Sequence, residues 1–178
     1  MRYLCRWPSV VATLVILALV AGCADSKHRS ARDTTKVDLG NRQSQGAACA
    51  LLDDASLDPL FPGDVPDPSG TSMGKGFAEC EWAARDDGPV VLVSILPATD
   101  FRSDYVKQLT VTAPVAGIGD GAVSFPGLVG IGRGSADGGS VGFTSGNAAA
   151  IVAVRSTGTP AKDAAQATML AKVVEKKI

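Results

Sequence analysis

The chain has 178 residues, with 17 Lys and Arg against 18 Asp and Glu, so its formal net charge is -1. This balance provides no strong positive field, which argues against a protein that captures DNA or RNA through the phosphate backbone. Twenty glycines and ten prolines accompany 46% hydrophobic and 5% aromatic residues. Such a composition is typical of one turn-rich globular domain rather than of a disordered or collagen-like chain.

The N-terminal segment predicts export and a lipid anchor. Arg2 and Arg6 precede an apolar run from Val10 to Val20, which has the form of a signal peptide and is too short for a transmembrane helix of about 20 residues. The run ends in Val-Ala-Gly-Cys, which resembles the lipobox of bacterial lipoproteins. We interpret residues 1–22 as a lipoprotein signal peptide and Cys23 as the lipidated first residue of the mature chain. Ordinary secretory cleavage nearby is the alternative.

Residues 23–46 predict a disordered tether behind that cysteine. The segment is rich in Ser, Thr, Gln and Asn and has no apolar periodicity. Residues 24–46 carry five basic and three acidic side chains, so contact with anionic lipid headgroups is an alternative to a plain solvated spacer. We therefore expect the chain on the outer face of the cytoplasmic membrane, with the membrane as a partner through Cys23.

The remaining cysteines predict one disulfide. Cys5 belongs to the signal peptide and Cys23 to the anchor, which leaves Cys49 and Cys80 in an exported domain, where two cysteines usually pair. Closing this loop would stabilise the fold by roughly 3–4 kcal/mol in the chain-entropy model. A structural zinc site would need four closely spaced ligands, and the single histidine, His28, lies in the tether. We expect no metal and no cofactor.

The first half of the domain predicts a short helix over 47–52, a capped turn at Asp53 and Asp54, and a loop over 62–76. In the strand 77–83, alternation turns Cys80 inward and leaves Glu79 and Glu81 on a solvated face. The continuous apolar run 90–96 indicates a strand covered on both faces. Thr99 or Asp100 is expected to cap a helix over 101–109, which has an apolar stripe.

The second half predicts a meander followed by a helix. After the glycine turn 117–121, β-prone runs occupy 122–125, 128–133, 140–144 and 148–155. Thr159 and Pro160 mark the start of a last helix that should pack across the sheet. The expected fold is a single α+β domain over residues 47–178, with an antiparallel sheet of five to six strands and helices packed on one face.

Five patterns in the domain could suggest chemistry, and we interpret each as structural. Gly138–Gly142 matches G-x-S-x-G, but the domain contains no histidine to serve as a base. Ser72–Lys75 matches S-x-x-K, but it lies in a glycine-rich loop rather than at a helix start, and the later K-T-G signature is absent. The glycine turn 117–121 lacks the Gly-Lys-Ser/Thr of a phosphate loop. Glu79 and Glu81 have a separation a glycosidase could use, and the aspartates of 53–67 could suggest calcium, but an exposed strand face and helix caps account for them. We expect no catalytic residue.

Three stretches together resemble a known family. They are Cys49-Ala50-Leu51-Leu52, Cys80-Glu81-Trp82 and the turn from Val115 to Ala122, behind the lipobox. In this order they are similar to the actinobacterial, mycobacterial-type lipoproteins known as domain of unknown function 3558. The resemblance implies a cell-envelope lipoprotein with one disulfide and no established catalysis, and it supplies no catalytic residues.

Two functions follow from these observations. The first is a non-enzymatic accessory or protein-binding module with a partner in the cell envelope. The alternative is a carrier of a lipid or another hydrophobic small molecule, held between the last helix and the sheet. A hydrolase is a third and weaker interpretation. A deep apolar cavity would distinguish the carrier from the accessory module.

Overall fold

The computed structural model describes residues 46–74, 76–109, 113–130 and 133–178, which belong to one compact unit. The predicted signal peptide, Cys23 and all but the last residue of the predicted tether lie outside the described residues. Within the described ranges, no helix is long and apolar enough to span a membrane.

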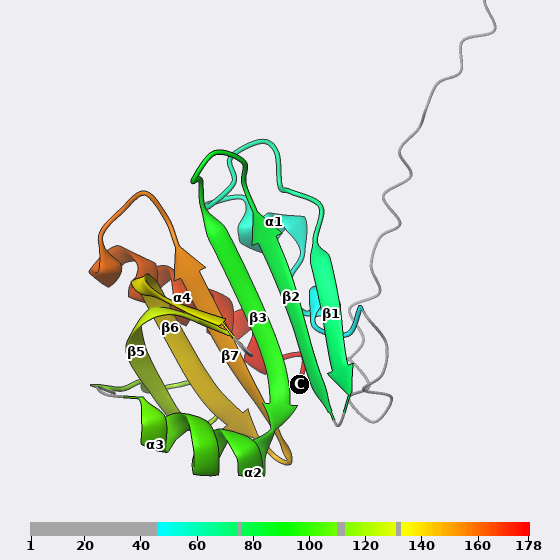
Figure 1. Ribbon diagram of the computed structural model, residues 1–178, viewed down its shortest axis with the longest axis vertical. Coiled ribbons are helices and arrows are strands. Elements are labelled where there is room, and N and C mark those ends of the chain that lie inside the picture. Colours follow the sequence, from blue (N-terminus) through cyan, green and yellow to red (C-terminus); the bar gives the residue numbers. More distant parts are fainter. Residues whose placement is uncertain (1–45, 75, 110–112, 131–132) are drawn as a thin grey trace, which may run out of the picture. The chain divides into compact units, whose positions relative to one another are not determined.

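A seven-stranded antiparallel sheet forms the centre of the fold (Figure 1). Its spatial order is β1-β2-β3-β7-β6-β5-β4. The strands are β1 (Ser69–Gly74), β2 (Phe77–Ala83), β3 (Val90–Pro97), β4 (Ala113–Pro114), β5 (Asp120–Gly130), β6 (Arg133–Ser145) and β7 (Ala148–Arg155). The central strands β3 and β7 are almost wholly buried, as their continuous apolar sequences require.

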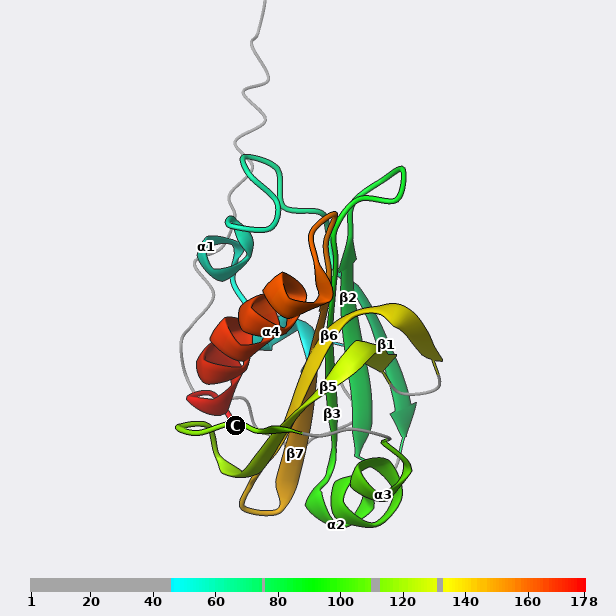
Figure 2. The ribbon, with the colours of Figure 1, turned by 90° about the vertical axis from the view of Figure 1, so that its left-hand side faces the viewer.

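The first face of the sheet carries the main core. It is covered by α4 (Pro160–Glu175) and by the short elements η2 (Cys49–Leu51) and α1 (Asp54–Leu57), which lie on one side of the sheet in Figure 2. Inward residues of the central strands meet Ala167, Leu170, Ala171 and Val174 of α4. The predicted last helix is confirmed: the Thr159 side chain accepts a hydrogen bond from Lys162 N, and a proline occupies the first turn.

The second face is covered as well, so the prediction that helices pack on one face only was wrong. A continuous helical segment of α2 (Ala98–Asp100), the π-helical turn η3 (Phe101–Tyr105) and α3 (Val106–Gln108) packs on it. Phe101 lies directly on Gly142 of β6, where an added Cβ would come within 2.5 Å of the ring. Pro97, not Thr99 or Asp100, precedes the helical segment, and no side chain caps it.

The expected count of five to six strands was also wrong. β1 forms where a loop was predicted. Its polar, glycine-containing sequence has no apolar alternation that would indicate a strand, and its pairing with β2 depends on backbone bonds. β4 is a two-residue strand, paired with Ser124 and Val123 of β5. The predicted strand 122–125 and residues 128–130 of the predicted strand 128–133 belong to β5. Arg133 instead begins β6, which extends through the glycine-rich stretch before Ser140.

The β5–β6 hairpin bends over the second face. The register between its strands shifts next to Gly127, which has φ +89°, a left-handed conformation that favours glycine. Beyond the bend, Leu128 packs on Val90, Leu92 and Ala153. Figure 2 shows this end of the hairpin on the side of the sheet opposite α4. The second face is therefore covered both by the helical segment from α2 to α3 and by the end of the β5–β6 hairpin.

Candidate functional site

The disulfide predicted from the cysteines is present. Cys49 and Cys80 are joined and buried, with their Cα atoms 5.0 Å apart. The bridge links η2 to β2, and Trp82 belongs to the same core. It therefore fastens the first turn of the domain to the sheet.

Glu79 lies in a buried polar centre on the second face, which corrects the prediction of a solvated strand face. Its side chain is 4% exposed, and Glu81 is half-buried. The Ser94 hydroxyl donates a hydrogen bond of 2.8 Å to Glu79 Oε2. The backbone of Gly130 approaches so closely that an added Cβ would lie 2.5 Å from the same oxygen. The alternation in β2 correctly predicts that Glu79 lies on the opposite face from Cys80, but it does not show that the hairpin covers this face.

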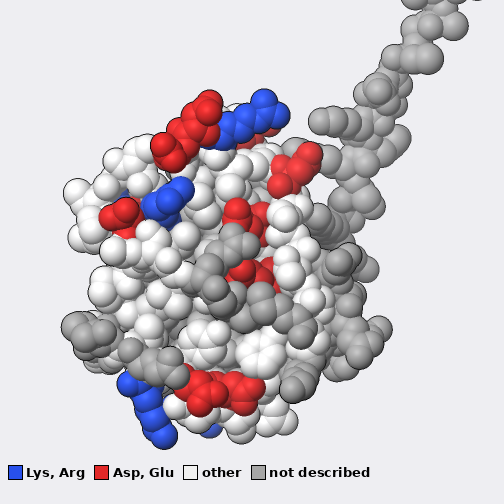
Figure 3. Space-filling view, in the orientation of Figure 1, with Lys and Arg blue, Asp and Glu red and all other residues white. Residues whose placement is uncertain are grey.

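Tyr105 belongs to the surroundings of this centre. Burial raises the pKa of its phenol above 10.0, and the negative charges of Glu79 and Asp104 raise it further. Acidic side chains are visible near the middle of this face in Figure 3. The Glu79 carboxylate and the Ser94 hydroxyl are thus hydrogen-bonded, and Glu79 has its partners within the fold.

Ser140, the serine of the G-x-S-x-G match, has a structural role. It is fully buried, its hydroxyl donates to Gly127 O at 2.7 Å, and it accepts a bond from Val129 N at 3.1 Å. These bonds satisfy backbone groups released where the β5 register shifts. The hydroxyl is therefore not placed to attack a substrate, in agreement with the interpretation of this motif as accidental.

The other patterns also receive structural explanations. Ser72 lies in β1, away from any helix start, and Lys75 is outside the described residues. Gly117 and Gly119 form the turn that leads into β5, and Gly121 lies in the strand itself. The described residues contain no group of three or more His, Cys, Asp or Glu that could hold a metal ion.

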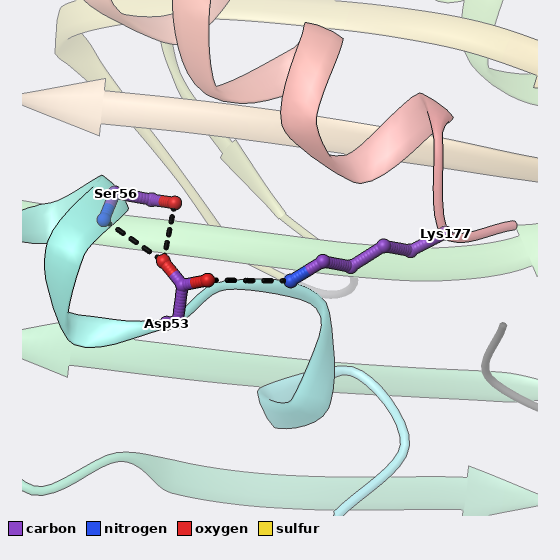
Figure 4. A network of polar contacts seen from close by, with 3 residues as sticks. All are labelled: Asp53, Ser56 and Lys177. Carbon is purple, nitrogen blue, oxygen red and sulfur yellow. Dashed lines mark hydrogen bonds and ion pairs between the residues drawn. The ribbon is translucent and has the colours of Figure 1, made fainter. Parts of the chain in front are cut away.

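Asp53 caps α1 and connects it to the C-terminal end of the chain (Figure 4). Its Oδ1 accepts bonds from Ser56 N at 2.9 Å and Ser56 Oγ at 2.5 Å, and Oδ2 lies 3.7 Å from Lys177 Nζ. These Ser56 bonds, with the charge of Lys177, hold the pKa of Asp53 below its ordinary value of 3.8. The acidic cluster thus serves helix capping at this position, as predicted.

The interface between α4 and the sheet is tightly packed. A Cβ added to Gly139 of β6 would lie 2.4 Å from the backbone nitrogen of Ala164. Ala167, Ala171 and Val174 are fully buried in the same interface. Among the described residues this contact leaves no room for a hydrophobic ligand between Gly139 and the helix.

A polar pocket of about 360 Å³ opens beside the start of α4. Its walls come from the β2–β3 turn, the middle of β6, the end of β7 and the loop that leads into α4, and the β2–β3 turn and that loop lie at the same end of the sheet (Figure 1). The lining residues are Asp87, Asp137, Gly138, Arg155, Ser156, Thr157, Gly158, Pro160 and Asp163. Three carboxylates and one guanidinium therefore share one small hollow.

Asp163 is the most buried charged residue of this pocket, at 2% exposure. Ser156 Oγ donates to Asp163 Oδ1 at 2.5 Å and in turn accepts from Gly158 N at 3.0 Å. The position in the first turn of α4 also suits a negative charge, because the helix dipole is positive there. The loop thus holds this carboxylate in a fixed orientation.

The charged groups of the pocket were not identified from the sequence. Asp87, Asp137, Arg155 and Asp163 come from four separate parts of the chain, and none belongs to a recognisable motif. The helix-start signal at Thr159 and Pro160 located one wall of the pocket, but only the sheet order brings the β2–β3 turn and β6 beside it.

Comparison of the chain with protein-family models, curated proteins and solved structures found no match.

Proposed function

We propose that the chain is a cell-envelope lipoprotein, anchored through Cys23 to the outer face of the cytoplasmic membrane, whose domain is a non-enzymatic accessory or protein-binding module. The observation that carries this proposal is the buried disulfide between Cys49 and Cys80. Such bridges persist in oxidising compartments outside the cytoplasm, where the signal peptide and lipobox would direct the chain. The same bridge supports the proposed membership in the lipoprotein family that the sequence resembles.

The non-enzymatic role is supported by how the fold uses its polar residues. Ser140 is committed to the backbone of β5, and Glu79 is enclosed beside Ser94 and Gly130. A nucleophile or a general base must reach a substrate, and these two side chains are buried. The pocket at the start of α4 is instead an open polar hollow, which suits binding.

A carrier of a hydrophobic molecule would need an apolar cavity between α4 and the sheet. The close approach of Gly139 to Ala164 speaks against such a cavity at that place.

Membrane fractionation tests the anchor. The wild-type chain and two variants, Cys23→Ser and Cys5→Ser, are expressed in a bacterium that processes lipoproteins. We expect Cys23→Ser to move the protein into the aqueous fraction, because the acyl chains provide the membrane affinity. Cys5→Ser is the matched control and should stay with the membrane, since Cys5 leaves with the signal peptide. Membrane retention of the Cys23→Ser protein would contradict the proposal.

A further inference from the structure

We propose that the pocket beside α4 binds a zwitterionic ligand, one that carries both an ammonium and a carboxylate group and has the size of an amino acid or a dipeptide. This inference goes beyond the proposed accessory or protein-binding role, because it assigns a small-molecule ligand to the pocket. It follows from three properties of the pocket: its mixed charge, a buried carboxylate with an open oxygen, and its volume.

The mixed charge excludes ligands of a single sign. Arg155 forms no ion pair with any carboxylate of the described residues, although it lines the pocket together with three aspartates. A purely anionic ligand would be repelled by Asp87, Asp137 and Asp163. A purely cationic ligand would leave the guanidinium of Arg155 unpaired and close to a like charge. A zwitterion offers a carboxylate to the guanidinium and an ammonium to the aspartates.

Asp163 is a built element of the site. Its Oδ1 is occupied by Ser156, whereas no hydrogen-bond or ion-pair partner is found for Oδ2 among the described residues. That oxygen keeps a small exposure to solvent, and Asp163 lines the pocket. A carboxylate in a residue that is 98% buried loses most of its hydration, and a ligand ammonium would replace it.

The pocket volume of about 360 Å³ lies near the lower end of the range of small-molecule sites, about 300–1,000 Å³. Its walls are polar or small, including Gly138, Gly158, Ser156 and Thr157. A large apolar ligand would find few partners here. The dimensions and the lining fit a small polar molecule with two charged groups.

Calorimetric titration of the full-length mature chain in mild detergent tests the ligand class. The probes are L-lysine and L-alanyl-L-alanine, compared with N-acetyl-L-alanyl-L-alanine, which keeps only the carboxylate, and L-alanyl-L-alanine amide, which keeps only the ammonium. We expect saturable binding of at least one zwitterion with a Kd of about 1 mM or lower. Each single-charge derivative of the dipeptide should bind at least about tenfold more weakly than the dipeptide itself, or not saturably. No saturable binding of either zwitterion, or equal binding of a single-charge derivative, would overturn the proposal.

Two variants with a matched control assign the charges. Arg155→Gln should weaken dipeptide binding about tenfold and leave the amide derivative unaffected. Asp87→Asn should weaken both. Asp86→Asn is the control, because Asp86 shares the same turn and the same left-handed backbone as Asp87 but does not line the pocket. An effect of Asp86→Asn as large as that of Asp87→Asn would overturn the assignment. The titrations are made in detergent, so their failure leaves the anchor at Cys23 untouched.

Discussion

Ser94 and Glu79 are direct neighbours across β3 and β2, and the serine hydroxyl donates to Glu79 Oε2 at 2.8 Å. Both side chains are buried, at 0% and 4% exposure. A buried carboxylate is costly unless its oxygens are hydrogen-bonded. The pair therefore allows the hairpin that carries Gly130 to close over the second face of the sheet.

Ser94→Ala should lower the free energy of unfolding by about 1–3 kcal/mol, because it removes a hydrogen bond from a buried charged group. Urea unfolding of a chain that starts at residue 23 measures this, with Trp82 as its single tryptophan. The control is Ser124→Ala, whose hydroxyl makes a longer, exposed bond of 3.3 Å to Ala113 O. We expect a change within about 0.5 kcal/mol there. Equal losses in the two variants would contradict the role of Ser94.

Glu79→Gln should lower the pKa of Tyr105. Burial is the largest cause that raises this pKa above 10.0, and the charge of Glu79 is the next. Removing that charge makes the phenolate easier to form, so the titration should begin at lower pH. Tyr105 is the single tyrosine of a chain that starts at residue 23, and tyrosinate absorbance reports it directly. Glu175→Gln, a change on α4, is the control and should leave the titration where it was. An unchanged curve for Glu79→Gln would contradict the proximity.

The sequence predicted those parts of the fold that depend on side-chain pattern. The apolar run of β3, the inward face of β2 and the start of α4 at Thr159 and Pro160 are local signals, and all three were confirmed. β1 was missed because backbone pairing with β2 creates it. The long extent of β6 was missed for the same reason, since glycines carry no side-chain pattern.

The candidate site shows the same division. The pairing of Cys49 with Cys80 could be predicted because cysteine counting needs no geometry. The burial of Glu79 could not, since the bend at Gly127 determines which face the hairpin covers. Arg155 and Asp163 line one pocket because β7 ends shortly before α4 begins, and the sheet order brings β6 alongside.

Gly139→Ala should destabilise the domain strongly. An added Cβ would lie 2.4 Å from the backbone nitrogen of Ala164, so α4 would have to move away from the sheet. Overpacking of this kind costs about 1–3 kcal/mol or more. Gly134→Ala in the same strand is the control, because the nearest atom there is Leu128 O at 3.7 Å, an ordinary contact. Thermal unfolding of both variants measures the difference, and a Gly139→Ala domain as stable as Gly134→Ala would show that α4 is loosely seated.

Loss of the disulfide should lower the free energy of unfolding by roughly 3–4 kcal/mol. The bridge closes a separation of 31 residues and thereby restricts the unfolded chain. The double variant Cys49→Ala and Cys80→Ala is compared with the oxidised protein in urea. A parallel check is alkylation of the unreduced, denatured protein with iodoacetamide. We expect neither Cys49 nor Cys80 to be modified, and modification of both would show that the bridge does not form.

Asp53→Ala should destabilise the domain at neutral pH and much less in acid. The folded state holds the pKa of Asp53 below 3.8, chiefly through the hydrogen bonds from Ser56, so the ionised carboxylate stabilises the folded state. A depressed folded pKa gives stabilisation that is present above about pH 3.8 and disappears as the pH falls through the folded pKa. At pH 7 the loss should be about 0.5–2 kcal/mol, toward the lower end because the Asp53 side chain is 49% exposed.

Urea unfolding of wild type and Asp53→Ala between pH 7 and about pH 2 measures this difference. Asp64→Ala is the control, since the Asp64 side chain makes no hydrogen bond or ion pair with the described residues. Its effect on the free energy of unfolding should stay small. If the loss of unfolding free energy in Asp53→Ala persisted unchanged in acid, the stabilisation would come from packing of α1 rather than from the charge of Asp53. Raised salt separates the two contributions of the carboxylate, because screening weakens the ion pair with Lys177 and leaves the bonds from Ser56 in place.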